Sequence, residues 1–401
     1  MMIKAKASLK GKINYVVEYV EPVTQEKTAI PTEDIQEIIP DKNITGLSKV
    51  IIQPIPNEYA KTEGTLAISN NGEYNVKTYE KVNVQTSPKI VDIDYTKIND
   101  NASYTNFYYM ITHIYDVDLS SISRNHCKYL FANLINLIYL PDQIEIPQNI
   151  TNIANMFNSC NKLTKIPEMN TSNINDMSSL FAYCSNLESI PLLDVANVKY
   201  TSSMFTDCSK LKELPDLSFG DLSSGNSMFL NCSNLLNLNN IKINKISGLL
   251  SHMFFSCFHL KNLPVLQNKD FSGVTYMGNF ANSCYILEDI VSFFGENPNT
   301  TNCTDFSNAF RACYLLKDLP VFDFSKAKNL ASMFDSILSK NNLTDNALNN
   351  ILLSCCTVGS SYTSTKTLKT LFNATLGREY QARIQSLPAY QQFLDAGWTI
   401  N

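Results

Sequence analysis

Apolar side chains return in the same order about every 24 residues between Leu130 and Phe334. One copy runs from Met156 to Pro167. It consists of a Met-Phe pair, a Cys three residues after the Phe, a Leu three residues later, an Ile or Leu three residues further on, and then a Pro. The cysteines of successive copies are 24, 24, 24, 25, 27 and 29 residues apart. A period in this range predicts a solenoid, in which each repeat buries its apolar face only against its neighbours.

Four positions of each copy are predicted to face the interior, namely the Phe, the Cys, the Leu and the residue before the Pro. In the first three complete copies these core residues are Phe157, Cys160, Leu163, Ile166, Phe181, Cys184, Leu187, Ile190, Phe205, Cys208, Leu211 and Leu214. Burying a large apolar side chain contributes roughly 1.5 to 3 kcal/mol, whereas ordering the backbone costs about 1 to 2 kcal/mol per residue. A lone copy therefore cannot hold itself together, and the stack is the unit of stability.

The flanks of the array follow other patterns. Residues 1–88 hold short β-branched or aromatic runs separated by turn signals, which predicts a small all-β module. Residues 89–129 are predicted to be a linker and a cap over the first repeat, with the aromatic cluster at 104–110 as an alternative contact surface. The repeats occupy residues 130–340, as about eight to nine copies. The period fails afterwards, and residues 341–401 are predicted to form a small α+β cap that begins with a helix after Thr344.

Composition narrows the choice of partners. Lys and Arg number 32 against 37 Asp and Glu, a formal net charge of −5, so charge gives no reason to expect nucleic acid. No apolar run approaches the 18 residues that predict a membrane-spanning helix, and we expect no membrane insertion. The Lys-rich amino terminus lacks the apolar core and cleavage site of a signal peptide, so ordinary secretion is not expected.

The cysteines are predicted to serve packing. Seven of the eleven occupy the same position of successive repeats, and Cys is among the most often buried residue types. Neighbouring members of this column could lie near strand spacing, which leaves disulfide bridging geometrically conceivable. The odd total and the missing signal argue against bridging. No CxxC pair exists and the four histidines are not at ligand spacing, so we expect no metal and no cofactor.

No motif supports catalysis, and we expect a protein that is not an enzyme. Paired acids such as Glu288 and Asp289 keep one alternative open, because a polysaccharide depolymerase needs two carboxylates about 5 to 10 Å apart. The other interpretation of these acids is a solvated strand face.

Two features are candidate binding surfaces. The position before the Ile or Leu of each repeat should face solvent, and its charged members are Lys165, Glu213, Asp289 and Asp318. No single chemistry repeats along this column, which favours a local site over a polymer gripped by every repeat. The array also widens at Gln267–Gly273 and Val291–Asn302, and insertions on a solenoid often form its binding face. The second insertion contains Phe293 and Phe294, which could be a surface anchor or could pack under the neighbouring repeat.

The M-F-x-x-C-x-x-L-x-x-[IL]-P copies resemble the BspA-like leucine-rich repeat family and cover about half of the chain. The resemblance implies an α/β leucine-rich-repeat solenoid, with a short parallel strand at L-x-x-I and a compact helical turn at M-F-x-x-C. Ala281 in place of Phe and Asn239 in place of Pro depart from the pattern, so their repeats are expected to pack less regularly.

A second resemblance concerns the amino-terminal segments. Gln25–Thr28, Pro31–Asp41, Gly46–Val50 and Pro54–Pro56, followed by Asn71–Tyr79, resemble segments of virion structural proteins of tailed bacteriophages, and Phe393–Ile400 resembles the closing segment of repeat-bearing phage tail proteins. This resemblance implies a protein of the virion surface, assembled in the host cytoplasm. Its expected partners are other virion proteins of tail, baseplate, collar or capsid, and a host surface protein or glycan. A homo-oligomer is conceivable, and a bacterial surface adhesin is the alternative.

Overall fold

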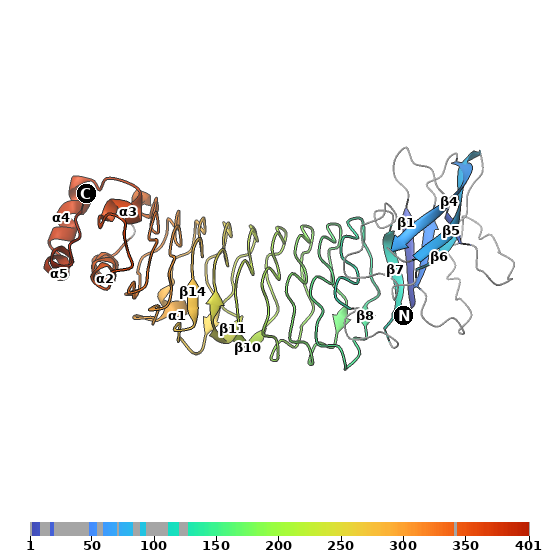
Figure 1. The fold of residues 1–401 in the computed structure, drawn as a ribbon, viewed down its shortest axis with the longest axis horizontal. Helices are drawn as coiled ribbons and strands as arrows, with labels where there is room; N and C mark the ends of the chain where they lie inside the picture. The colour runs from blue at the N-terminus through green and yellow to red at the C-terminus, as the bar shows by residue number, and fades with distance from the viewer. Residues whose placement is uncertain are drawn as a thin grey trace. The chain divides into compact units, whose positions relative to one another are not determined.

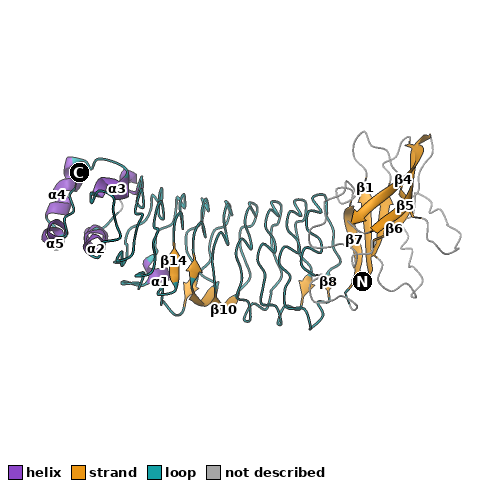
Figure 2. Ribbon diagram, viewed as in Figure 1, coloured by secondary structure: helices purple, strands orange, loops and turns teal. Residues whose placement is uncertain are grey.

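The computed structural model describes residues 2–8, 17–19, 48–53, 59–69, 72–82, 89–93, 111–119, 127–340 and 343–400. These form two compact units, residues 1–173 and residues 174–401. Figure 1 shows the elements of each unit in chain order. Figure 2 shows that turns and loops make up most of the repeat coils, with short strands between them.

The first unit begins with β-strands in two sheets. A four-stranded sheet has the order β6-β3-β1-β7, and a three-stranded sheet has the order β2-β5-β4. The strands are β1 (Met2–Ser8), β2 (Val17–Tyr19), β3 (Ser48–Gln53), β4 (Tyr59–Ser69), β5 (Gly72–Val82), β6 (Lys89–Ile93) and β7 (Ile111–Asp118). Strand β1 pairs with β3 in parallel, and the remaining pairs are antiparallel.

Strands β6 and β7 follow residue 88, and both belong to the sheet that contains β1 and β3. The predicted domain boundary at residue 88 stays a prediction. Three of the segments that carry the phage resemblance, Gln25–Thr28, Pro31–Asp41 and Pro54–Pro56, lie outside the described residues, as does the aromatic cluster at 104–110.

The first repeat coils complete this unit. The Ile114 amide in β7 donates to the Tyr139 carbonyl oxygen at 2.9 Å, so strand and first coil share a backbone hydrogen bond. The rings of Phe131 and Phe157 stack at a centroid distance of 5.4 Å. Strands β8 (Gln143–Ile144) and β9 (Glu168–Met169) pair in parallel on successive coils.

The second unit continues with coils whose Met-Phe segments are chains of tight turns. In one coil the amides of Ser203, Phe205 and Asp207 donate to carbonyl oxygens of the next coil, while the amides of Met204, Thr206 and Cys208 donate three residues back. Ser203 and Asp207 have φ of 57° and 59°, a left-handed conformation that small polar residues tolerate better than bulky ones. These left-handed residues interrupt the helical path, so the implied compact helical turn is wrong for this segment.

The interior of this unit is a ladder of repeated side chains. The rings of Phe205 and Phe229 are 5.4 Å apart and nearly parallel, at 3°. All twelve predicted core side chains, across both units, are at most 8% exposed. Their burial is what the repeat pattern predicts.

The regular strands lie elsewhere than the resemblance implied. They follow the Pro position or precede the next Met-Phe pair: β10 (Ser218–Leu222), β11 (Lys242–Ile246), β12 (Gly248–Leu249), β13 (Val265–Leu266) and β14 (Val274–Tyr276). All their pairings are parallel. Among the described coils, the L-x-x-I segment contributes no regular strand but single bridge residues, such as Tyr139 and the bridge between Asn237 and Asn262. The strands occupy the longer segment between the Pro and the next Met-Phe pair, and in β10 the side chains of Phe219 and Leu222 are buried.

A helical cap closes the carboxyl end of the second unit (Figure 1). After the 3-10 turn η3 (Ile337–Lys340) come α2 (Asp345–Cys356), α3 (Leu368–Phe372), α4 (Arg378–Gln385) and α5 (Tyr390–Asp395). Thr344 caps α2 as predicted, because its hydroxyl oxygen accepts the Ala347 amide at 3.0 Å. Near the carboxyl end, Thr399 forms one parallel bridge with Thr367.

The cap takes over the bonds that a further coil would make. The Ser332 and Phe334 amides donate to the carbonyl oxygens of Thr370 and Leu371 at 2.7 and 2.9 Å. The Phe372 ring lies 5.9 Å from the Phe334 ring. The last coil therefore ends on satisfied backbone groups and covered apolar surface.

Candidate functional site

The charged column before the Ile or Leu of each repeat does not form a common site. Lys165 in the first unit and Glu213 in the second are exposed. Asp289 accepts the backbone amides of Val291 and Ser292 at 2.8 and 3.2 Å. Asp318 accepts the hydroxyl of Thr344, the capping residue of α2. Two of the four candidates thus serve local structure.

The second insertion contributes its aromatic side chains to the core and not to the surface. Its four-residue helix α1 (Val291–Phe294) carries Phe293 and Phe294, which are both fully buried. The prediction of a surface anchor at these two residues is therefore wrong, and the pair packs among the neighbouring repeats. The Phe294 ring lies 5.3 Å from Phe280, 6.1 Å from Phe310 and 5.4 Å from Phe322.

This packing accounts for the irregular repeat at Ala281. That copy has Phe280 and Ala281 where most copies have Met and Phe, and the next copy reverses the sizes with Ala309 and Phe310. The Phe280 ring meets the Phe254 ring edge to face instead of stacking on it. Rings from α1 pack against Phe280, so the insertion supplies bulk in the repeat that has Ala281 at the usual Phe position.

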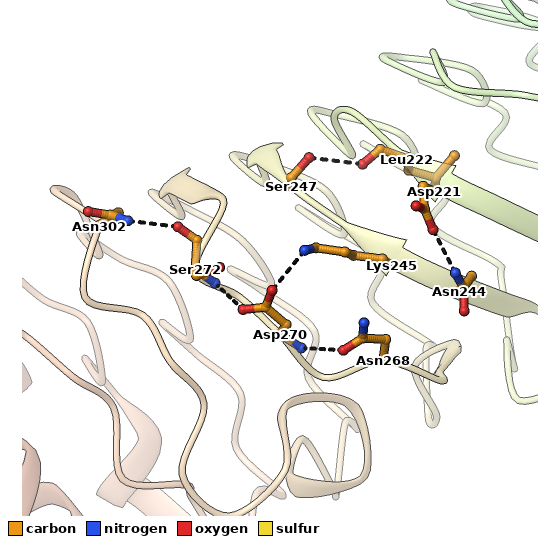
Figure 3. Close-up of polar contacts among 9 residues, drawn as sticks. All are labelled: Asp221, Leu222, Asn244, Lys245, Ser247, Asn268, Asp270, Ser272 and Asn302. Atoms are coloured by element: carbon orange, nitrogen blue, oxygen red, sulfur yellow. Dashed lines mark hydrogen bonds and ion pairs between the residues drawn. The ribbon is translucent and has the colours of Figure 1, made fainter.

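The first insertion is fixed by polar contacts, which Figure 3 shows. The Lys245 ammonium of β11 lies 2.7 Å from the Asp270 carboxylate. The same carboxylate accepts the Ser272 amide at 2.9 Å, and the Asp270 amide donates to Asn268 Oδ1 at 3.2 Å. Hydrogen bonds from Lys245 and Ser272 hold the pKa of Asp270 well below its usual range.

Further side chains link this region to the coils on either side. Asn244 Nδ2 donates to Asp221 Oδ1 at 2.6 Å, and Asn302 Nδ2 donates to the Ser272 carbonyl oxygen at 2.8 Å. Ser247 Oγ donates to the Leu222 carbonyl oxygen at 3.2 Å. These side-chain hydrogen bonds join each coil to the next over this part of the surface.

The thiol column forms a regular hydrogen-bonded ladder. Cys208, Cys232 and Cys257 donate to the carbonyl oxygens of Phe181, Phe205 and Phe229 in the preceding coil, at 3.0 to 3.1 Å. The described cysteines are free, and all but Cys356 are buried. Burial raises the pKa of Cys232 well above the usual value and that of Cys313 to about 12. The column therefore has the surroundings of packing thiols and not of nucleophiles.

An aromatic column on the outer surface was not predicted. The residue after the Cys is Ser185, Ser209 and Ser233 in three coils, and it becomes Phe258, Tyr285 and Tyr314 in the next three. Phe258 and Tyr285 stack at 5.0 Å, and Tyr285 and Tyr314 at 5.4 Å. Tyr285 is 38% exposed, and the other two are half-buried. Aligning the copies by their cysteines would have revealed this change from serine to aromatic residues.

A charged column lies three residues further along the same coils. The Glu288 carboxylate lies 2.7 Å from the Lys317 ammonium and 3.6 Å from that of Lys261. Lys317 is the main cause of the lowered pKa of Glu288, with Lys261 adding to it. The described parts of the chain contain no cluster of side chains suited to a metal ion. Within the same parts, no helix has the length and apolarity to span a bilayer.

The family model described as "Mycoplasma protein of unknown function, DUF285" matches residues 142–242 and 223–347, which together are just over half of the chain. The chain belongs to the DUF285 family. The match spans most of the predicted repeat array of this DUF285 chain. It supports the resemblance of the repeats to the BspA-like leucine-rich repeat family.

Comparison with solved structures found a leucine-rich repeat protein from Bacteroides ovatus. It is 16% identical, with a TM-score of 0.22, and the match covers 77% of the DUF285 chain and 98% of that protein. No curated protein matches the chain.

Proposed function

We propose that this DUF285 chain is a virion structural protein of a tailed bacteriophage. In this proposal residues 1–88 attach the chain to the particle, and the repeat coils are displayed for contact with the host surface or with neighbouring virion subunits. The resemblance of the amino-terminal segments to virion proteins supports the attachment role. The repeat family supports the role of a scaffold without enzymatic activity.

One observation carries the display role. Some ionisable groups of the described coils join neighbouring coils at the surface, as at Lys245 and Asp270 and at Glu288 with its two lysines. A surface bonded from coil to coil pays little ordering entropy on binding, which favours recognition. The paired acids Glu288 and Asp289 are likewise bound, to lysines and to α1 amides. Their engagement favours a scaffold over a depolymerase.

The test compares particles assembled with the full chain and with a chain that lacks residues 1–88. Particles are purified on a density gradient, and the chain is quantified by mass spectrometry. We expect the full chain to sediment with the particles and the shortened chain to remain unassembled. The thiols of the shortened chain must still be protected from a labelling reagent, which shows that its coils are folded. Equal incorporation of both chains would overturn the attachment role.

A bacterial surface adhesin is the second candidate. Two observations favour it: the description of the family names Mycoplasma, and the repeats resemble the BspA-like bacterial-surface type. This candidate requires the chain in the cell envelope of a bacterium that produces no particles. Fractionation of such cells, with the chain detected by immunoblotting, distinguishes the two candidates.

A further inference from the structure

Two tyrosines of adjacent coils stack on the outer surface of the second unit. The ring centroids of Tyr285 and Tyr314 lie 5.4 Å apart, and the ring planes differ by 22°. Tyr285 is 38% exposed, and Tyr314 is half-buried. The equivalent residues of three earlier coils are serines, so the coil backbone does not require aromatic rings at this position. We call Tyr285 and Tyr314 the tyrosine pair.

The two coils that carry the tyrosine pair are bonded to each other close to the rings. The Lys317 ammonium donates to the Glu288 carboxylate at 2.7 Å, and these residues follow the two tyrosines by three positions. In the core, the thiol of Cys313, directly before Tyr314, donates to the Ala281 carbonyl oxygen at 3.1 Å. Bonds on both sides of the pair therefore restrict how far the two rings can move apart.

Two phenols held in contact can be joined by one-electron oxidation. Each tyrosine gives up its hydroxyl proton and one electron, which leaves a phenoxyl radical whose unpaired electron is shared with the ring carbons beside the oxygen. A carbon–carbon bond forms between one such carbon of each ring, and the hydrogen atoms on these two carbons move to the oxygens and restore both phenols. The product is dityrosine, and the pair has lost two protons and two electrons in all. Hydrogen peroxide takes up both and becomes two molecules of water.

Proximity favours a link within the pair over links between chains. Groups that are held together in a good orientation react with effective concentrations of about 10⁵ M or more, whereas a second chain in solution is far more dilute. A large oxidant needs to reach only the exposed Tyr285, because an electron can pass between rings in contact. Phe258 of the preceding coil stacks on Tyr285 at 5.0 Å but has no hydroxyl group, so this stack of three rings can form a single link.

We propose that the tyrosine pair is a site of oxidative cross-linking, at which a peroxidase with hydrogen peroxide forms dityrosine between Tyr285 and Tyr314. The link fastens two adjacent coils covalently at the surface. It stabilises the folded chain in the way that a disulfide does, because it restricts the conformations open to the unfolded chain. The proposal goes beyond the display role and does not depend on where the chain resides, so either can fail without the other.

The test treats the purified full-length chain, at high dilution, with a haem peroxidase and hydrogen peroxide. Dityrosine is detected by its blue fluorescence, and mass spectrometry of the digested chain identifies the linked peptides by the loss of two hydrogen atoms. Size-exclusion chromatography separates single chains from cross-linked multimers. Tyr285→Phe and Tyr314→Phe keep a ring in the stack and remove only the reacting hydroxyl group. Tyr183→Phe is the matched control, because Tyr183 is 50% exposed on another coil.

We expect a linked peptide that joins Tyr285 to Tyr314 within single chains. Its yield should fall by about ten-fold or more in Tyr285→Phe and in Tyr314→Phe, and should be unchanged in Tyr183→Phe. The oxidised parent chain should have a higher urea midpoint than the untreated chain. Dityrosine at other positions only, between chains only, or not at all would overturn the proposal, as would a link that leaves the urea midpoint unchanged.

Discussion

The thiol of Cys232 donates to the carbonyl oxygen of Phe205 in the preceding coil, at a distance of 3.0 Å. The same carbonyl oxygen accepts the amide of Cys208 from its own coil, at 3.1 Å. The repeated Cys thus fills a small interior space and also bonds one coil to the next. Aliphatic residues of similar size could fill the space but could not donate.

This relationship predicts the effect of replacing a column thiol. Cys232→Ala removes a fully buried group and its hydrogen bond, and we expect a loss of about 1 to 3 kcal/mol in the free energy of unfolding. The measurement is the urea midpoint followed by circular dichroism. Cys356→Ala is the matched control, because Cys356 is half-buried on α2, and it should stay within about 0.5 kcal/mol of the parent. Equal losses in the two variants would contradict the role of the column.

The buried thiols also predict a dependence of stability on pH. Burial raises the pKa of Cys313 from an ordinary value of 9.0 to about 12. The neutral thiol is favoured in the folded state, so its contribution is complete below pH 9 and is lost as pH rises toward 12. We expect the urea midpoint to fall steadily above pH 9. The free energy of unfolding of Cys313→Ala should fall less steeply with pH than that of the parent, with slopes that differ by about 1.4 kcal/mol per pH unit at most. Identical slopes in the two chains would contradict the assignment.

The rings supplied by α1 predict a large effect of one substitution in the second insertion. Phe294→Ala removes a fully buried ring that contacts Phe280, Phe310 and Phe322. We expect a loss of about 3 to 5 kcal/mol, measured by urea unfolding. Leu192→Ala serves as the control, since Leu192 is 64% exposed and should change stability by no more than about 0.5 kcal/mol. A surface role for Phe294 would instead leave stability unchanged.

A glycine in the second unit marks a close approach between coils. Gly248 has φ of 69°, and a Cβ atom there would lie 2.3 Å from the Ser223 carbonyl oxygen. Gly248→Ala should therefore destabilise the chain by more than about 1 kcal/mol, through backbone strain and the clash together. Gly377→Ala meets no atom within 4 Å and should change the melting temperature little. Comparing the two melting temperatures by differential scanning fluorimetry checks this prediction.

The sequence predicted the repeat interior because the periodic pattern is itself the packing pattern. Phe157 or Cys208 is buried in its coil for the same reason that it recurs, namely that each copy must cover its neighbour. Thr344 was identified as a helix cap from its own chemistry, and the structure confirms it. Such features depend on neighbours in sequence or on the period, and both can be read from one chain.

The departures had causes that no single repeat reveals. Ser203 and Asp207 have left-handed backbone conformations, and a small polar residue type does not by itself predict such a conformation. The burial of Phe293 and Phe294 depends on the space beside Phe280 in another repeat. The stacked rings of Phe258, Tyr285 and Tyr314 required a comparison of equivalent positions between coils, because Tyr285 alone is an ordinary exposed tyrosine.

The proposed place of the chain on a phage particle is tested most directly by labelling. Intact particles are purified from the host, and a gold-tagged antibody against the carboxyl-terminal cap is located by electron microscopy. The account predicts gold at a fixed position on the outside of the particles, and none on particles made without the chain. Gold confined to the bacterial cell envelope, with unlabelled particles, would contradict it.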